Sequence, residues 1–370
     1  MKADSESEPG IERKPLGRFK GFLLKLAFLG VSLLVALLIG ELLVRLLLPQ
    51  NIVPRYVESA DWGIRKNIGG VSGRLVTDEF DHEFTTNSRG FRGQDEYEIP
   101  KPDKVYRVIV LGDSVALGHG VGDDETFSEV LERKLSERFP CEVINMGVSG
   151  FGTAEQLIQL EEVALEFDPD LVVLGYFTND PYNNVVCKLY TLEDGELKKN
   201  EEAFVPAIAT RDRLYKIPGY TFLSQHSHLV NLLRGKASAY FTRKLGEEAG
   251  VADTSGRNVP DEAVSLTKAL LEKLSEVCRE NELPLVILDI PLFRGGERTN
   301  NLPLDPASPP AGSRIVSVAD EVYGDHPVEE LTFPTDCHPT PTGHRLMGDW
   351  LADLIGSESE WSGFPASSEN

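Results

Sequence analysis

The sequence predicts an α/β fold built around a parallel sheet and preceded by one membrane-spanning helix. From about residue 105 onward, short β-branched runs alternate with amphipathic stretches, which is typical of βαβ units. Small and polar residues follow the ends of successive apolar runs. Near the N-terminus, residues 22–48 are almost entirely apolar, which is typical of a helix that spans a bilayer.

The α/β pattern extends over residues 101–356 and divides into strands, helices and two insertions. We expect strands at residues 105–111, 141–146, 171–176 and 283–290. Helices are expected between and after them, at residues 125–139, 154–167, 261–281 and 342–355. Two irregular insertions, at about 181–260 and 293–333, interrupt the pattern, and loops of this length usually build or cover a site. Residues 357–370 predict a flexible polar tail.

The apolar segment reads FLLKLAFLGVSLLVALLIGELLVRLLL and has no charge between residues 26 and 40. A buried core helix would be the other interpretation, but a helix that is apolar on every side is typical of a membrane span. Lys25 can snorkel at one end, while Glu41 and Arg45 are spaced to pair near the other. No small-residue cleavage site follows Gly40, so we expect an uncleaved signal anchor.

Charge sets the expected orientation of this anchor. Basic residues precede the uncharged stretch, namely Arg13, Lys14, Arg18, Lys20 and Lys25. The positive-inside rule therefore places residues 1–21 in the cytoplasm and everything after Pro49 outside it, in the periplasm or at the cell surface. Residues 49–100, rich in Gly, Thr, Asn, Arg and Asp, predict a strand-and-loop extension that braces the α/β domain against the membrane.

The composition excludes some classes of partner. Lys plus Arg number 37 against 59 for Asp plus Glu, a net charge of −22, which argues against binding nucleic acid. We expect neither a metal nor a cofactor, because no cysteine or histidine spacing resembles a zinc site and no H-E-x-x-H motif occurs. Nothing in the sequence sets the oligomeric state.

The four cysteines are compatible with an oxidising compartment. Cys141 and Cys278 lie in apolar patterns and are expected to be buried thiols. Cys187 and Cys337 are expected in loops, as disulfide partners or inert thiols.

Four short motifs mark the strand ends, where ligands bind in an open parallel sheet. They are Gly112-Asp113-Ser114, the segment ending in Ser149-Gly150, Thr178-Asn179-Asp180, and Asp336-Cys337-His338. Each motif alone is common. Their joint occurrence in this order supplies a nucleophile, a base and hydrogen-bond donors, which is what acyl transfer requires.

We expect Ser114 to be the nucleophile, exposed at a strand-to-helix turn that the small Gly112 permits. His338 would be the base that takes its proton. The imidazole would be oriented either by Asp336 or by a backbone carbonyl, since triad chemistry needs such a partner.

An oxyanion forms during acyl transfer and needs donors. The backbone N–H groups of Ser114 and Gly150 and the side-chain amide of Asn179 are the candidates. Asp113 is interpreted as structural, because a carboxylate pointing into this hole would oppose the charge that forms there.

Neighbouring residues have simpler interpretations. Gly118, Gly120 and Gly122 do not have the G-x-G-x-x-G spacing of a nucleotide-binding loop. His344 falls on another face of the final helix and is expected to be structural. His119 follows the nucleophile turn, where it would either line the substrate cleft or be a solvent-exposed loop residue, and the exposed position is the one expected.

Together, Ser114, Gly150, Asn179 and His338 resemble the four named residues of the SGNH/GDSL hydrolase superfamily, over about residues 87–355. The resemblance implies a flavodoxin-like three-layer α/β/α fold, a mostly parallel sheet and serine esterase activity. The segment NSRGFR at residues 87–92 and the C-terminal segment DCHPTPTGHRL at residues 336–346 resemble those of the membrane-anchored bacterial branch of this superfamily.

This chain departs from the family pattern at two places. Val115 stands where the family name has leucine, and Asp336 precedes His338 by two residues where many members have three. The shorter spacing also occurs in polysaccharide O-acetyltransferases that resemble the superfamily.

Three functions are compatible with these motifs. The first is an esterase that acts on an acyl sugar or a lipid through an acyl-serine intermediate. The second is an envelope polysaccharide O-acyltransferase using the same triad, and the third is a noncatalytic envelope-binding protein. The insertions decide between hydrolysis and transfer, and their fold is not readable from the sequence.

Overall fold

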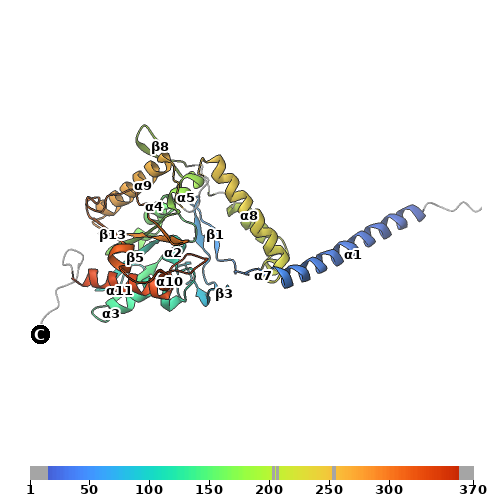
Figure 1. The fold of residues 1–370 in the computed structure, drawn as a ribbon, viewed down its shortest axis with the longest axis horizontal. Helices are drawn as coiled ribbons and strands as arrows, with labels where there is room; N and C mark the ends of the chain where they lie inside the picture. The colour runs from blue at the N-terminus through green and yellow to red at the C-terminus, as the bar shows by residue number, and fades with distance from the viewer. Residues whose placement is uncertain (1–15, 202–204, 206–207, 252–255, 358–370) are drawn as a thin grey trace, which may run out of the picture.

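The computed structural model describes residues 16–201, 205, 208–251 and 256–357 (Figure 1). Arg13 and Lys14, the predicted cytoplasmic segment up to residue 15, and residues 358–370 of the predicted tail lie outside the described residues.

A five-stranded parallel sheet forms the centre of the domain, in the order β13-β10-β7-β5-β6. Its strands are β5 (Tyr106–Gly112), β6 (Cys141–Asn145), β7 (Leu171–Phe177), β10 (Leu285–Ile290) and β13 (Ser313–Ser317). If these five strands are numbered 1 to 5 along the chain and read from the β6 edge, their order is 2-1-3-4-5. This is the flavodoxin-like arrangement, in which the winding direction reverses beside the first strand. The predicted fold class is confirmed.

Helices cover both faces of this sheet (Figure 1). On one face lie α3 (Phe127–Ser136) and α11 (Pro341–Ser357), and on the other α4 (Thr153–Glu162) and α9 (Asp261–Glu280). Side chains alternate along a strand, so Val108 and Val110 of β5 belong to the first core, while Ile109 and Leu111 belong to the second. Every residue of β5 and β7 is buried, which explains their continuous apolar sequences.

The two insertions are more regular than the sequence predicted. The first contains α5 (Asp180–Cys187), the hairpin β8 (Tyr190–Glu193) and β9 (Glu196–Lys199), α6 (Ile208–Tyr215), α7 (Tyr220–His226) and α8 (His228–Glu248). The second contains the hairpin β11 (Leu292–Arg294) and β12 (Glu297–Thr299), the edge strand β13, a π-helical turn (Val318–Tyr323) and α10 (Val328–Leu331). Strand β13 was missed because only two of its residues, Ile315 and Val316, are buried.

The extension after the anchor consists of two antiparallel hairpins. They are β1 (Val57–Ser59) with β2 (Arg65–Asn67), and β3 (Ser72–Val76) with β4 (Asp81–Thr85). The extension packs against the strand-end loops of the sheet: Asn67 donates from Nδ2 to the carbonyl of Gly147 at 2.8 Å, and the Arg92 N–H donates to the carbonyl of Asn145 at 3.0 Å.

Helix α1 (Leu16–Leu47) projects away from the domain and meets it only at its C-terminal end (Figure 1). Its segment Lys20–Leu47 is long and apolar enough to cross a membrane, and none of it is buried against the rest of the protein. Leaving such a surface in water would be costly, so an apolar environment suits this helix.

All four cysteines are free and buried. The expectation that Cys187 lies in a loop is wrong, because it is the last residue of α5 and is 3% exposed. Burial raises the pKa of Cys187 and of Cys278 to about 12, which makes both thiols poor nucleophiles.

Candidate active site

Ser114 begins a short helix, α2 (Ser114–Leu117), immediately beyond the carboxyl end of β5. The turn between them depends on Gly112, whose φ is +155°. A Cβ atom there would lie 2.5 Å from the Cβ of Ala116 and 2.9 Å from the carbonyl oxygen of Gly175. Only glycine fits, so the predicted tight bend is present, and it leaves Ser114 partly exposed at the sheet edge.

Asp113 is fully buried and caps α2. Its carboxylate accepts hydrogen bonds from the N–H of Val115 at 2.8 Å and from Nδ2 of Asn179 at 3.0 Å. Burial raises the pKa of Asp113. These contacts agree with the interpretation of Asp113 as a structural residue that ties the nucleophile turn to the end of β7.

His338 links Ser114 to a carboxylate. Its Nε2 lies 2.8 Å from the Oγ of Ser114, and its Nδ1 lies 2.5 Å from the Oδ1 of Asp336. The structure thus brings together three residues separated by up to 224 positions in the chain. It also decides between the two partners considered for Nδ1, because the contact is to the carboxylate and not to a backbone carbonyl.

The short spacing of Asp336 and His338 is accommodated by a tight turn. The N–H of Phe333 donates to the carbonyl of His338 at 2.9 Å, and the N–H of Cys337 donates to the carbonyl of Phe333 at 3.1 Å. Cys337 itself has a φ of +69°, which is uncommon for a residue with a side chain. The chain therefore turns between the acid and the base, and their side chains meet.

His119 also approaches Asp336, which corrects the expectation of a solvent-exposed loop residue. Its Nε2 lies 3.6 Å from Oδ2 of Asp336, its ring packs edge-on against Phe80, and its side chain is 21% exposed. Burial acts to raise the pKa of Asp336, but the interactions of its carboxylate with His119 and His338 outweigh burial and hold that pKa well below its usual range. The carboxylate therefore stays ionised.

Among the described residues, His119, Asp336 and His338 also have ligand atoms close enough together to hold a metal ion, within 4.8 Å of one another. Both ring nitrogens of His338 already have partners, however, in Ser114 and Asp336. The donor set fits a hydrogen-bonded triad better than a metal site.

Gly150 lies in the loop after β6, with a φ of +79°. Its carbonyl accepts a hydrogen bond from Arg65, which also pairs with the buried carboxylate of Glu155. A Cβ atom at Gly150 would lie 2.5 Å from Nη1 of Arg65. Within the described chain the N–H of Gly150 has no acceptor, so it is available to a ligand.

Asn179 precedes α5 at the carboxyl end of β7. One N–H of its amide is taken by Asp113, and the other remains for a ligand. Its Oδ1 is buried and has no hydrogen-bond partner among the described residues. The structure thus places Asn179 beside the nucleophile turn, while its function as an oxyanion donor, like that of Gly150, stays a prediction.

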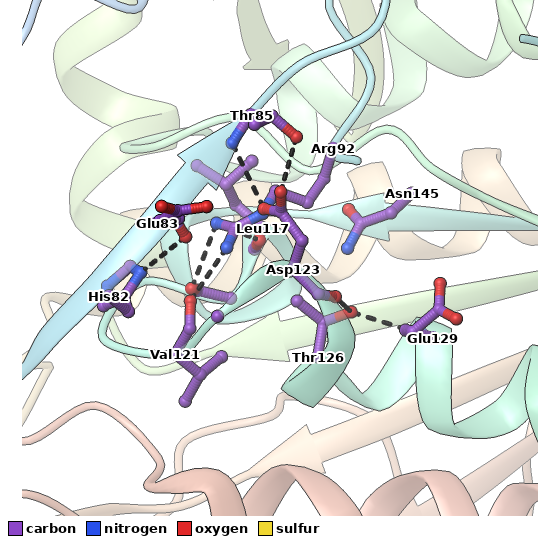
Figure 2. Close-up of polar contacts among 12 residues, drawn as sticks. His82, Glu83, Thr85, Arg92, Leu117, Val121, Asp123, Thr126, Glu129 and Asn145 are labelled. Atoms are coloured by element: carbon purple, nitrogen blue, oxygen red, sulfur yellow. Dashed lines mark hydrogen bonds and ion pairs between the residues drawn. The ribbon is translucent and has the colours of Figure 1, made fainter. Parts of the chain in front are cut away.

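Arg92, in the extension, holds the loop that follows the nucleophile helix (Figure 2). Its guanidinium is buried, pairs with Asp123 at 2.6 Å and donates to the carbonyl of Val121 at 2.8 Å. It also donates to the carbonyls of Leu117 and Gly118, at 3.4 and 3.3 Å. One side chain therefore fixes residues 117–123, directly after Ser114.

Glu79, at the turn between β3 and β4, holds the opposite side of the site. Its two carboxylate oxygens accept hydrogen bonds from the backbone N–H groups of Thr335 and Asp336, each at 2.8 Å. The neighbouring Phe80 packs on Phe333 with ring centroids 5.2 Å apart. The extension therefore braces the site itself. Sequence reasoning missed Glu79, because one acidic residue in a turn carries no motif.

His344 is structural, as predicted. It is fully buried, its Nδ1 accepts a hydrogen bond from the N–H of Phe127 at 3.2 Å, and its ring stacks on that residue. Burial lowers its pKa to about 3, so the ring stays neutral and can cap the first turn of α3.

The comparison with protein families gives one match, to the GDSL-like lipase/acylhydrolase family over residues 110–346. This range includes Ser114, Gly150, Asn179 and His338. The chain belongs to the GDSL-like lipase/acylhydrolase family. It is therefore an enzyme of the SGNH/GDSL esterase type, and the predicted superfamily is confirmed.

The chain is also similar to several solved structures. For Axe2, an acetylxylan esterase from Geobacillus stearothermophilus, the identity is 13%, the TM-score is 0.37, and the match covers 69% of this chain and 95% of that one. For the esterase EstA from Pseudoalteromonas sp. the identity is 12% and the TM-score 0.34, and the match covers 68% of this chain and 96% of that one. For TesA the identity is 14% and the TM-score 0.36, and the match covers 67% of this chain and 97% of that one. A search of curated proteins gave no match.

Proposed function

We propose that this GDSL-family enzyme is a membrane-anchored serine esterase, held by α1, which hydrolyses the ester of an acyl sugar or a lipid outside the cytoplasm. The observation that carries the catalytic part is the unbroken line of contacts from Ser114 Oγ through His338 to the Asp336 carboxylate. Nucleophile, base and orienting acid are all within hydrogen-bond reach, which is the geometry that acyl transfer needs.

In the first half-reaction, Nε2 of His338 takes the proton of Ser114 as Oγ attacks the ester carbonyl carbon. The carbonyl oxygen becomes an oxyanion, which the N–H groups of Ser114 and Gly150 and the free amide N–H of Asn179 stabilise. The bond to the alkoxy group then breaks, and His338 gives its proton to the departing alcohol. The acyl group remains on Ser114.

In the second half-reaction, His338 removes a proton from water as the water attacks the acyl-enzyme. The second tetrahedral intermediate collapses, the carboxylic acid leaves, and the proton returns to Ser114. In both steps the ionised Asp336 stabilises the imidazolium that forms on His338 and holds the tautomer that presents Nε2 to the serine.

The catalytic proposal is tested with Ser114→Ala in the full chain, purified in detergent. The variant should lose both hydrolysis of a p-nitrophenyl ester and labelling by a fluorophosphonate, while its unfolding temperature stays that of the native protein. Labelling and turnover that persist in this variant would show that another residue is the nucleophile.

A substrate panel tests the substrate class. Acyl sugars, short p-nitrophenyl esters and lysophospholipids are compared, with and without oligosaccharide acceptors. Release of free acid at the same rate with and without acceptor supports hydrolysis. Acyl sugar accumulating at the expense of free acid would favour the acyltransferase.

The anchor is supported by the length, exposure and apolar composition of α1. Reporters fused after Leu48 test its orientation. Alkaline phosphatase should be active there and a cytoplasmic fluorescent protein should not. The opposite pattern would reverse the proposed orientation, and release of a soluble domain would show that the segment is cleaved.

A further inference from the structure

The N-terminus of helix α8 contacts the anchor helix α1 at Glu41. The carboxylate of Glu41 in α1 accepts hydrogen bonds from the hydroxyl of Ser227 at 2.6 Å and from the N–H groups of His228 and Leu229 at 2.9 and 3.0 Å. These groups form the N-terminus of α8, where a negative charge is favoured. If the hydrocarbon layer begins near Phe22, the roughly 20 residues that cross it end near Glu41.

From this point α8 runs across the direction of α1, along the side of the domain from which α1 emerges (Figure 1). It therefore lies in the plane that a membrane crossed by α1 would occupy. The two buried residues of α8 are Asn231 and Gly246. Near the second, the hydroxyl of Tyr182 in α5 donates to the carbonyl of Thr242 at 2.9 Å, so this face of the helix is turned toward the domain.

The opposite side of α8 exposes three large apolar side chains. Leu233, Tyr240 and Phe241 are 60%, 53% and 54% exposed, and their spacing of seven and eight residues puts them on one side of the helix. Leu229 continues this stripe toward the anchor, where a Cβ on Gly40 would lie 3.3 Å from its Cδ2. The exposed stripe is thus continuous with the apolar surface of α1.

Basic side chains flank this stripe. Helix α8 carries Arg234, Lys236, Arg243 and Lys244, in a chain whose net charge is −22. The last two pair with Glu247 and Glu248 at the end of the same helix, at 3.6 and 3.5 Å, so Arg234 and Lys236 are the basic residues beside the stripe that have no acidic partner within α8. Among the described residues, Lys236 forms no ion pair with a carboxylate. An exposed helix with aromatic and leucine side chains on one face and lysine and arginine beside them is typical of helices that lie in a lipid headgroup layer.

We propose that α8 is an interfacial helix that seats the enzyme on a bilayer containing anionic lipids, with Leu233, Tyr240 and Phe241 inserted and the flanking basic residues at the phosphates. This proposal rests on the proposed function, because it requires α1 to span the same membrane. It adds a second attachment, which holds the domain in a fixed orientation to the surface. A second copy of the chain is the other possible occupant of this face.

The experiment places a polarity-sensitive fluorophore at single introduced cysteines in the full chain, in nanodiscs whose lipids carry nitroxide quenchers both near the headgroup and along the acyl chain. The reporter sites are Leu233→Cys and, as the matched control, the likewise exposed Ser238→Cys, which helical periodicity places on the other side of α8 from Leu233. Leu34→Cys reports on α1. The labelled native chain, whose four cysteines are buried, provides the blank.

Lipid quenching should be several-fold stronger at position 233 than at position 238, and strong at position 34. Equal, weak quenching at 233 and 238 with strong quenching at 34 would overturn the interfacial helix and leave the anchor intact. Weak quenching at all three positions would overturn both. Shielding at 233 that depends on the number of protein copies per disc, and not on the quencher, would assign the face to a second copy and refute the proposal.

The charge requirement is tested with Lys236→Glu. In discs containing phosphatidylglycerol this variant should show less quenching at position 233, and in phosphatidylcholine alone the change should be small. Hydrolysis of a soluble p-nitrophenyl ester should be unaffected. Equal behaviour of the variant and native chains in phosphatidylglycerol would refute the preference for anionic lipid.

Discussion

Replacing Asp336 with asparagine tests the most specific feature of the site, the contact between a carboxylate and a histidine only two residues away. Oδ1 of Asp336 lies 2.5 Å from Nδ1 of His338, and the pKa of Asp336 lies well below its usual range, so a full negative charge faces the ring. Asparagine keeps the size of the side chain and removes the charge.

The magnitude follows from the charge that the catalytic step creates. When His338 takes the proton of Ser114 it becomes an imidazolium, and two opposite unit charges about 4 Å apart attract by about 4 kcal/mol at an effective dielectric constant of about 20. Losing that attraction in the transition state corresponds to roughly 10³-fold in rate. The asparagine amide can also donate a hydrogen bond to Nδ1 and so favour the imidazole tautomer that cannot accept the serine proton. Neutralising the aspartate of a serine protease triad lowers kcat by roughly 10⁴-fold. We therefore expect kcat/KM to fall by roughly 10³- to 10⁴-fold.

The assay is steady-state hydrolysis of a p-nitrophenyl ester, together with the rate of fluorophosphonate labelling, for Asp336→Asn, His338→Ala and the native chain. His119→Gln is the matched control, because it removes the other histidine beside Asp336 and leaves the contact with His338 in place. Its 3.6 Å contact is longer than an ordinary hydrogen bond, so the loss should stay below roughly tenfold. The reasoning would be refuted if Asp336→Asn kept more than about a tenth of native kcat/KM while His338→Ala was inactive.

Other predictions concern the surroundings of the triad. Glu79→Ala leaves the N–H groups of Thr335 and Asp336 without their acceptor, so kcat should fall by roughly 10- to 100-fold with KM nearly unchanged. An unaltered kcat would show that this turn keeps its conformation without Glu79. Asn179→Ala should lower kcat by roughly 10²-fold without changing the unfolding temperature. Near-native turnover would show that Asn179 is only a turn residue and does not stabilise the oxyanion. Burial, followed by neighbouring carboxylates, raises the pKa of Glu132 from 4.5 to about 7, so the folded state binds this proton more tightly than the unfolded state. The native free energy of unfolding should therefore fall as the pH rises from about 4.5 to 7, by at most about 3 kcal/mol. Glu132→Gln should remove this loss and be more stable than the native chain in urea at pH 8 but not at pH 4, and parallel pH profiles for the two proteins would contradict it.

The sequence alone predicted the fold class, the family, four of the five strands and the residues proposed as the triad, because each of these leaves a local pattern in the chain. Strands β5 and β7 are continuous apolar runs since both of their faces are buried, and such runs are visible without a structure. The nucleophile motif follows directly from the end of β5, where Gly112 is needed by the backbone itself. The apolar composition of α1 likewise requires no tertiary information.

Only the tertiary structure decided which groups act on the triad from a distance. Glu79 and Arg92 hold the two loops of the site from an extension that is separated from His338 by more than two hundred residues, and no spacing rule connects them. His119 was assigned to solvent for the same reason, because its approach to Asp336 depends on a turn elsewhere in the chain. That turn, with Cys337 in a left-handed conformation, also brings the carboxylate of Asp336, and not a backbone carbonyl, to Nδ1 of His338. Periodicity and motifs report what a residue does within its own strand or helix, whereas contacts between distant loops arise from packing that the local sequence does not encode.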